Sequence, residues 1–158
     1  MNTAYVALGA NLGDPAATVR AAFGALANLP ESRVAQCSSL YRTAPVGKLD
    51  QPEFVNAVAR LETTLAPEAL LDALHELERR FGRIRAEKDG PRTLDLDLLL
   101  YNDHFLDLPR LTLPHPRLHL RAFVLYPLAE IAPQLIIPGR GAIAAWLPAV
   151  ANQGIVKL

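Results

Sequence analysis

This sequence of 158 residues has a single cysteine and no excess of either charge. The single cysteine, Cys37, cannot form an intrachain disulfide and fits a reducing compartment; we expect it to fill space on a strand as a small apolar residue. The 16 lysines and arginines balance the 16 aspartates and glutamates, so the formal net charge is zero. Because a dedicated nucleic-acid-binding protein would carry a basic excess, we expect no nucleic-acid partner.

Long apolar runs are missing as well. No stretch reaches the roughly 18 apolar residues that a membrane span needs. Gly9, Asn11 and Asp14 also interrupt the N-terminal region before it could form a signal sequence. We therefore expect a cytoplasmic protein with no membrane partner. With 51% hydrophobic residues, the chain is long enough to form one domain over residues 1–158 with a sizeable core, and we expect a monomer.

Several motifs of nucleotide-binding and hydrolytic enzymes are absent too. The chain has no Gly-x-x-x-x-Gly-Lys-Ser/Thr sequence, which excludes a P-loop, and the loop from Gly9 to Gly13 has the wrong glycine spacing for a dinucleotide fingerprint. No His-x-x-x-His or Cys-x-x-Cys pattern indicates zinc. No serine lies in a glycine elbow for acyl transfer.

Hydrophobic periodicity and turn signals predict a series of strands and helices up to Tyr101. Their order is that of the α+β, ferredoxin-like βαββαβ arrangement, an antiparallel sheet with two helices on one face. We expect the functional residues on the face without helices. Beyond His104, turn and proline signals predict a C-terminal extension of short helices and strands around the sheet. The strands are expected at residues 3–8, 33–42, 54–62 and 94–101, and the helices at residues 15–29 and 66–81.

An Asp-x-Asp pair carries the first chemical signal. Leu94, Leu96 and Leu98 alternate with Asp95 and Asp97, which predicts a strand whose two carboxylates share a face with Cα atoms roughly 6.5–7 Å apart. Like charges this close repel, and a hard cation such as Mg²⁺ would relieve the repulsion because it prefers oxygen ligands. A solvated polar face on an edge strand is the competing interpretation of this pattern alone.

Basic residues gather in the sequence around this pair. An arginine guanidinium can form two parallel hydrogen bonds to a phosphate group, so this clustering favours Mg²⁺-assisted chemistry on a polyphosphate. Taken singly, each would be an ordinary surface residue. His115, between two prolines in a stiff loop, is a further candidate to bind phosphate. The basic residues that precede the two aspartates are Arg83, Arg85, Lys88 and Arg92, and those that follow them are Arg110, Arg117 and Arg121.

Two aromatic residues lie beside polar ones. Phe54 precedes Asn56 by two positions, and Phe123 follows Arg121 by two. An aromatic pair flanking an amide is suited to a flat heterocycle, because the rings stack on it and the amide hydrogen-bonds its edge. The alternative is that both phenylalanines belong to the core.

The chain resembles the 6-hydroxymethyl-7,8-dihydropterin pyrophosphokinase family of folate biosynthesis over nearly its whole length. The run Gly-Pro-Arg-Thr-Leu-Asp-Leu-Asp is the most specific of the matching motifs. The final thirty or so residues match only in general character. The matching segments are residues 5–13, 39–45, 50–56, 90–97, 113–116 and 121–128.

The resemblance implies transfer of the terminal diphosphate of ATP to the hydroxymethyl oxygen of the pterin, with release of AMP. Asp95 and Asp97 would hold two Mg²⁺ ions, and Arg83 and Arg92 would neutralise charge developing at the β-phosphorus. The implied pterin-binding residues are Asn11, Thr43, Val46, Phe54, Asn56 and Phe123. The implied nucleotide-binding residues are Glu78, Arg85, Arg92, Arg110, Thr112, His115 and Arg121.

One position departs from the family pattern. Relatives often carry an Arg-Trp pair just before the Gly-Pro-Arg motif, where this chain has Lys88-Asp89. A loop without this aromatic residue would close less tightly, and a negative charge near a triphosphate is unfavourable. We therefore expect a slower or more weakly binding enzyme than relatives with the tryptophan.

Two other functions fit part of the pattern. A non-catalytic ferredoxin-like binding module would share the order of elements but would not need two aspartates on one face beside so many arginines. A nucleotidyltransferase or glycosyltransferase could use Asp-x-Asp to hold a metal–nucleotide complex, but it would lack the slot of Phe54, Asn56 and Phe123.

Overall fold

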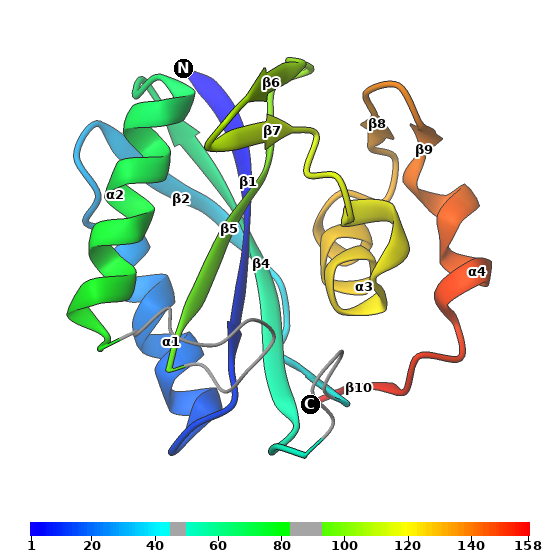
Figure 1. The fold of residues 1–158 in the computed structure, drawn as a ribbon. Helices are drawn as coiled ribbons and strands as arrows, with labels where there is room; N and C mark the ends of the chain where they lie inside the picture. Colours follow the sequence, from blue (N-terminus) through cyan, green and yellow to red (C-terminus); the bar gives the residue numbers. More distant parts are fainter. Residues whose placement is uncertain (45–49, 83–92) are drawn as a thin grey trace.

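The computed structural model of the chain describes residues 1–44, 50–82 and 93–158. It has a mixed α/β fold built on an antiparallel sheet, as the sequence predicts (Figure 1). The sheet contains β1 (Asn2–Ala10), β2 (Ser32–Cys37), β3 (Tyr41–Thr43), β4 (Phe54–Thr63), β5 (Asp95–Tyr101) and β10 (Ile155–Lys157). The helices are α1 (Pro15–Leu26), α2 (Pro67–Arg80), α3 (Ala122–Ile131) and α4 (Leu147–Val150), with 3-10 turns at Leu118–Leu120 and Ile143–Trp146. Two hairpins are formed by β6 (Leu106–Leu108) with β7 (Leu111–Leu113), and by β8 (Ile136–Ile137) with β9 (Gly141–Ala142).

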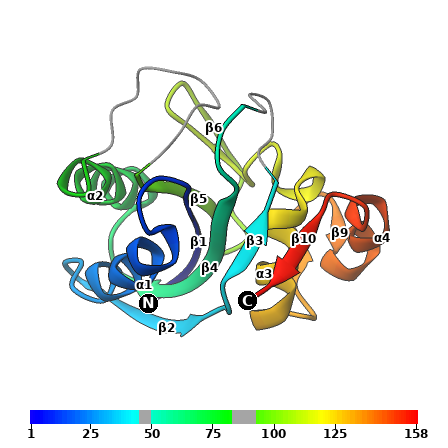
Figure 2. The same cartoon turned by 90° about the horizontal axis from the view of Figure 1, so that it is seen from below.

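Strand β1 lies inside the sheet, between β4 and β5. It pairs with β4 on one side and with β5 on the other, and both pairings are antiparallel. Strands β2 and β3 both pair with β4, and β10 pairs with β3 beyond it. The chain therefore has β5 at one end of the sheet and β10, its C-terminal strand, at the other (Figure 2).

Helices α1 and α2 cover one face of the sheet (Figures 1 and 2). Asp14 caps α1 by accepting a hydrogen bond from the backbone N–H of Ala17 at 3.2 Å, and Pro15 occupies the first helical position. The apolar stripes of both helices meet alternate residues of β1, β4 and β5, as the helical and strand periodicities require. The fully or nearly fully buried residues of this layer include Val19, Ala22, Leu26, Leu70, Leu74 and Leu77 from the helices and Val6, Leu8, Ala57, Leu61, Leu96 and Leu98 from the strands.

The opposite face is not free of helices, which corrects one expectation. Helix α3 packs there against Tyr5 and Val58 and forms a second core with the short C-terminal elements. The sequence of α3 is apolar on nearly every side, so it is buried rather than amphipathic at the surface. Phe54 and Asp95, at one end of the sheet, are not part of this second core.

A bulge in β5 lets one strand serve both cores. Tyr5 pairs with Leu100 and Val6 pairs with Leu98, so Leu99 is the extra residue. Before the bulge, Leu94, Leu96 and Leu98 belong to the α1/α2 core; after it, Leu99 and Leu100 belong to the α3 core. The alternation that was predicted from the sequence therefore holds for the aspartates and changes only past Leu98.

The strand expected over residues 33–42 is divided into β2 and β3. At the break, the Ser38 side chain accepts the N–H of Val58 at 2.9 Å, and the N–H of Ser39 goes to the Glu130 carboxylate at 3.0 Å. These side-chain bonds replace the ladder bonds of a continuous strand. Cys37, which we expected to be buried, lies exposed at the end of β2.

The C-terminal extension consists of short helices and strands, as expected. It includes β7, α3, and the 3-10 turn at Ile143–Trp146 that is followed by α4. In the described parts of the chain, no helix combines the length and apolarity that crossing a bilayer requires.

The α1/α2 core predicts the effect of a single truncation. Leu74 is fully buried in this layer, so Leu74→Ala should lower the free energy of unfolding by about 2–5 kcal/mol through lost apolar burial and the cavity left behind. Leu158→Ala is the matched control, because the Leu158 side chain is 54% exposed, and it should change stability by less than about 0.5 kcal/mol. Urea unfolding followed by circular dichroism measures both, and equal losses would contradict this assignment of the core.

Candidate active site

The two aspartates and Asn56 lie in neighbouring rows across the sheet. Gly9 of β1 pairs with Asp95 on one side and with Asn56 on the other. One step along the same face, Ala7 pairs with Asp97 and with Val58. Asp95 and Asp97 are both half-buried. The pairing of β1 thus sets carboxylates and an amide on one face, with a residue that has no side chain between Asp95 and Asn56.

Gly9 is required there by its neighbour. A Cβ atom at this position would lie 2.8 Å from Oδ1 of Asn56, closer than real contacts allow. The Asn56 side chain is fixed on its other side, where its Nδ2 donates a hydrogen bond to Oγ1 of Thr43 at 2.7 Å. Asn56 and Thr43 are 5% and 3% exposed, so burial holds the two side chains in this hydrogen-bonded arrangement. A glycine within a strand often marks such a close approach, and this signal was present in the sequence although our sequence analysis did not use it.

His115 lies near Asp95, in a loop anchored to β5. Its backbone N–H donates to the carbonyl of Leu99 at 2.9 Å, and its Nδ1 accepts a hydrogen bond from the N–H of Arg117 at 3.1 Å. Burial, followed by the positive charges of Arg121 and Arg117, lowers the pKa of His115 to about 4, although Asp95 acts in the opposite direction. The imidazole is therefore neutral near pH 7, with its proton on Nε2, where it can donate to an anion.

Arg121 joins the histidine to the predicted aromatic wall. It is close enough to His115 to lower the pKa of that residue, and its guanidinium carbon lies 5.2 Å from the centre of the Phe123 ring. Arg121 is the N-cap residue of α3, and Phe123 is in the first turn. Both residues are half-buried. The N-terminal end of α3 therefore places a cation near His115, with an aromatic ring beside that cation.

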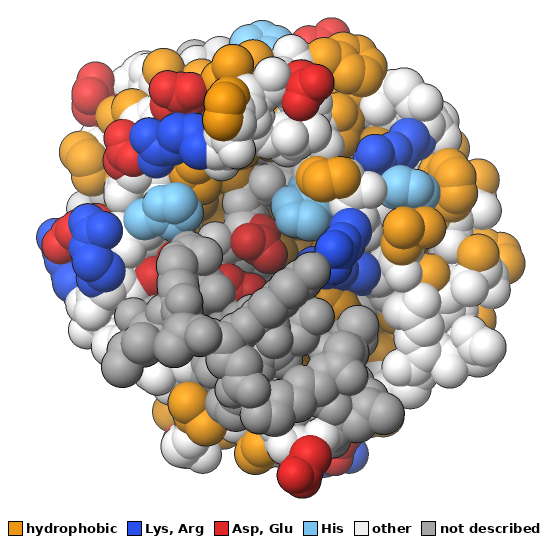
Figure 3. Space-filling model, viewed as in Figure 1, with side chains coloured by type: hydrophobic (Ala, Val, Ile, Leu, Met, Phe, Trp, Pro, Cys, Tyr) orange, Lys and Arg blue, Asp and Glu red, His pale blue; other side chains and the backbone are white. Residues whose placement is uncertain are grey.

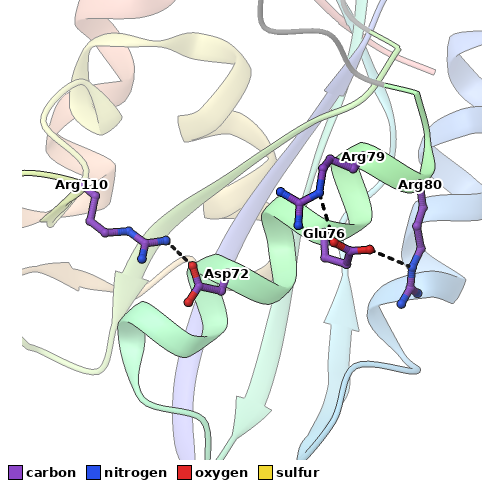
Figure 4. Close-up of polar contacts among 5 residues, drawn as sticks. All are labelled: Asp72, Glu76, Arg79, Arg80 and Arg110. Atoms are coloured by element: carbon purple, nitrogen blue, oxygen red, sulfur yellow. Dashed lines mark hydrogen bonds and ion pairs between the residues drawn. The ribbon is translucent and has the colours of Figure 1, made fainter.

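Arg110 and Thr112 belong to the β6–β7 hairpin. Arg110 forms an ion pair with Asp72 of α2, and both side chains are exposed (Figure 4). On the same helix, Glu76 pairs with Arg79 and Arg80 (Figure 4). Thr112 is exposed and pairs across the hairpin with Asp107. A nucleotide contacting Arg110 would have to share this guanidinium with Asp72 or displace that carboxylate.

Two predicted ligand residues bond to the protein itself. Glu78 is 1% exposed, and its Oε2 accepts the backbone N–H of Leu96, between the two aspartates, at 2.8 Å. Asn11 is 2% exposed, and its Nδ2 donates to Oε1 of Gln51 at 2.9 Å and to the carbonyl of Pro52 at 3.0 Å. Glu78 thereby ties α2 to β5, and Asn11 ties the end of β1 to the segment leading into β4.

Some predicted residues lie outside the described ranges. They are Val46 from the pterin set, Arg83, Arg85 and Arg92 from the catalytic and nucleotide sets, and Lys88-Asp89. Their roles stay predictions.

The face that carries this site is hollowed. Figure 3 shows acidic side chains at the bottom of the hollow, histidine side chains on both sides of it and basic side chains along one flank. A separate cleft of about 530 Å³ lies between the two hairpins and includes Thr112, Pro114 and Arg140 in its lining. Arg140 donates through Nη1 to the carbonyl of His115 at 3.1 Å, which ties the lining of this cleft to the loop that carries His115.

The donor set fits a hard cation that is completed by a ligand. Across the described ranges, no cluster of three or more histidine, cysteine or acidic side chains forms a ready-made metal cage. Two carboxylates on one face suit Mg²⁺ instead, because this ion is normally held by one or two carboxylates together with substrate phosphates and water.

Comparison with known proteins points to one family. The sequence profile of the family described as 7,8-dihydro-6-hydroxymethylpterin-pyrophosphokinase (HPPK) matches residues 5–133. A Pseudomonas aeruginosa protein named 2-amino-4-hydroxy-6-hydroxymethyldihydropteridine pyrophosphokinase is 51% identical over 154 residues, covering 98% of this chain and 95% of that protein. A Haemophilus influenzae protein of the same name is 44% identical over 158 residues, covering 100% of this chain and 99% of its own.

Solved structures share the fold. A Plasmodium falciparum HPPK-DHPS with pterin and p-hydroxybenzoate superposes with a TM-score of 0.73 at 14% identity, covering 99% of this chain and 46% of that one. An HPPK-DHPS in complex with substrates gives a TM-score of 0.71 at 14% identity, covering 94% of this chain and 43% of that one. This chain thus spans less than half the length of those solved chains. The profile match and the two bacterial relatives establish that this chain belongs to the 7,8-dihydro-6-hydroxymethylpterin-pyrophosphokinase family.

Proposed function

We propose that this chain transfers the diphosphate of ATP to the hydroxymethyl oxygen of 6-hydroxymethyl-7,8-dihydropterin, giving AMP and the pterin diphosphate in folate biosynthesis. The observation that carries the proposal is the pairing of Gly9 with both Asp95 and Asn56. This pairing places a carboxylate suited to a metal–polyphosphate and an amide suited to the edge of a heterocycle on the same face of the sheet. A nucleotidyltransferase would need the first of these alone.

Asp95 and Asp97 are proposed to hold the Mg²⁺ ions, two in number by resemblance to the family. When bound, the ions would neutralise the triphosphate and polarise its oxygens. The protein's part is positional: the buried Glu78 carboxylate fixes the backbone between the two aspartates, so their spacing is set before the nucleotide arrives. We therefore assign Glu78 to the support of the metal site rather than to direct nucleotide binding.

Asn56 and Thr43 are proposed to bind the edge of the pterin, with Phe54 and Phe123 on its two faces. Asn56 and Thr43 are already hydrogen-bonded to each other, so the amide is oriented without a ligand. Phe54 shares the face of Asn56, because the two residues are separated by one position on β4. By the same proposal, Asn11 shapes this end of the slot through its bonds to Gln51 and Pro52, and Val46 completes it.

His115, Arg121, Thr112 and Arg110 are proposed to bind the nucleotide. His115 would donate from Nε2 to a phosphate oxygen, and Arg121 would add a positive charge beside it. In the reaction the hydroxymethyl oxygen attacks the β-phosphorus, and the bond from that phosphorus to the oxygen that leaves with AMP breaks. Arg83 and Arg92 would neutralise the charge of this transition state, and Arg85 would contact the nucleotide.

The strand order β5–β1–β4–β2 with two helices on one face supports assigning the N-terminal part of the chain to the ferredoxin-like class. We further propose a cytoplasmic enzyme, since the activity uses ATP and a soluble pterin, and a monomeric one over residues 1–158.

The activity is tested by product analysis. Incubation with ATP, Mg²⁺ and 6-hydroxymethyl-7,8-dihydropterin should release AMP only when the pterin is present, as measured by chromatography. Asp97→Asn should lower this rate by roughly 100-fold or more, because it removes a charged ligand of the metal–phosphate complex. Asp103→Asn, in the exposed turn after β5, is the matched control and should leave the rate unchanged. ADP or free diphosphate formed without pterin would contradict the proposed function.

The close approach at Gly9 yields a second prediction. Gly9→Ala places a methyl group against Oδ1 of Asn56, turning the amide away from Thr43, and should raise the pterin Kd by roughly tenfold. Gly24→Ala makes the same substitution in α1, where a Cβ meets no atom within 4 Å. It should leave the Kd unchanged and raise stability by about 0.5–1 kcal/mol. Calorimetric titration gives the affinities. Unchanged pterin binding in Gly9→Ala would show that Asn56 does not contact the pterin.

The lowered pKa of His115 predicts a pH effect on the metal-free protein. The folded-state pKa of about 4 lies below the ordinary value of 6.5. Between these values the unfolded chain takes up a proton that the folded chain does not, so stability falls as pH falls from 6.5 toward 4. His115→Gln should lose on the order of 2 kcal/mol less stability than the unaltered chain over this interval.

Urea unfolding at pH 6.5 and pH 4.5 measures this difference. His104→Gln is the control, because His104 is exposed and should leave the pH dependence unchanged. If the unaltered chain and His115→Gln lose the same stability over the interval, the buried neutral state of His115 is wrong.

A further inference from the structure

The Gln153 side chain, from a distant part of the chain, forms hydrogen bonds to the N-terminal end of α3. Its Oε1 accepts the backbone N–H of Ala122 at 2.9 Å, and its Nε2 donates to the carbonyl of Leu120 at 3.0 Å. The two bonds fall on either side of Arg121. The N-cap of α3 makes no side-chain capping bond of its own, so Gln153 supplies the acceptor that an N-cap side chain usually provides.

Directly after Gln153, the chain forms the last strand of the sheet. Ile155, Val156 and Lys157 of β10 pair with Thr43, Arg42 and Tyr41 of β3. The backbone N–H of Leu158 then donates to the carbonyl of Leu40 at 2.9 Å. Because of β10, β3 lies inside the sheet rather than at its edge, as Figure 2 shows, and the backbone of Thr43 is held on both sides.

These two attachments converge on one slot. Gln153 fixes the segment that carries Phe123, and β10 fixes the strand that carries Thr43, the hydrogen-bond partner of Asn56. Within the pterin slot assigned above, Phe123 is a wall and Thr43 with Asn56 is the edge contact. Residues 153–158 touch both sides, although they lie beyond the 5–133 range of the family profile.

We propose that residues 153–158 are a positioning clamp for the pterin slot, with Gln153 as its principal side chain. This proposal rests on the proposed pterin-binding function. The clamp holds α3 and β3 at a fixed separation before substrate binds, so the pterin meets a formed slot. Without it, the fraction of molecules with a competent slot falls, and the apparent affinity for pterin falls by that fraction.

Three variants test the clamp: Gln153→Ala, Gln153→Glu and a chain ending at Asn152. Gln153→Ala removes both bonds and should raise the pterin Kd roughly three- to tenfold. Gln153→Glu retains the acceptor for Ala122 but loses the donor to Leu120, so its Kd should lie between those of Gln153→Ala and the unaltered chain. The shortened chain loses β10 as well and should bind pterin most weakly. Asn152→Ala, at the exposed neighbouring position, is the control and should bind pterin normally.

Calorimetric titration gives the pterin Kd and, separately, the Kd for a non-hydrolysable ATP analogue with Mg²⁺, and thermal unfolding gives the Tm. The clamp predicts a larger loss for pterin than for nucleotide in Gln153→Ala, because Phe123 forms a whole wall of the slot whereas Arg121 is one of several proposed nucleotide contacts. The Tm should stay within about 3 °C of that of the unaltered chain. Equal losses for both ligands in step with the Tm, or an unchanged pterin Kd, would overturn the clamp. If the unaltered chain itself binds no pterin, the proposed function fails, and the clamp fails with it.

Discussion

The register of β1 between β4 and β5 is the constraint on which the site depends. Because β1 lies between these two strands, it fixes which residue of β4 lies level with which residue of β5. A shift of one residue on either side would turn a whole strand over and exchange its buried and exposed faces. In the observed register, Gly9 faces Asp95 and Asn56 together, and leucines face the α1/α2 core. Burial of those leucines thus specifies the position of the carboxylates.

The bulge at Leu99 solves a related problem. A strictly alternating β5 would place Leu99 on the α3 side but Leu100 back in the α1/α2 core. The extra residue turns both toward α3, and Tyr101 then returns to the first core. The carbonyl of Leu99 also accepts the N–H of His115, so the irregular part of β5 anchors the loop that brings the histidine to Asp95. Bulges near active sites commonly redirect side chains in this way.

Local patterns predicted much of this molecule, and long-range contacts account for the rest. The period of two around Asp95 and the helical stripes of α1 and α2 are properties of short segments, and the structure agrees with them. The break between β2 and β3 depends on Glu130, which is far away in the sequence, and so no local pattern could reveal it. The same holds for the burial of Glu78 against Leu96 and for the ion pair of Arg110 with Asp72. Turn and proline signals predicted short helices and strands in the C-terminal extension, but not that α3 would cover the second face of the sheet.

Helix α3 is attached at both ends, which bears on how one wall of the slot stays in place. At its C-terminal end, the Glu130 carboxylate accepts hydrogen bonds from the hydroxyl of Tyr41 at 2.6 Å and from the hydroxyl of Ser39 at 2.9 Å. Tyr41 pairs with Asn56 across the sheet, so this end of the helix is tied to the strand that carries the slot's amide. Glu130 fixes one end of α3 to β3, and Gln153 fixes the other end to the segment leading into β10. Phe123 lies on this helix, so its position relative to the sheet is set by the packing of α3 in the second core together with the attachments at its two ends.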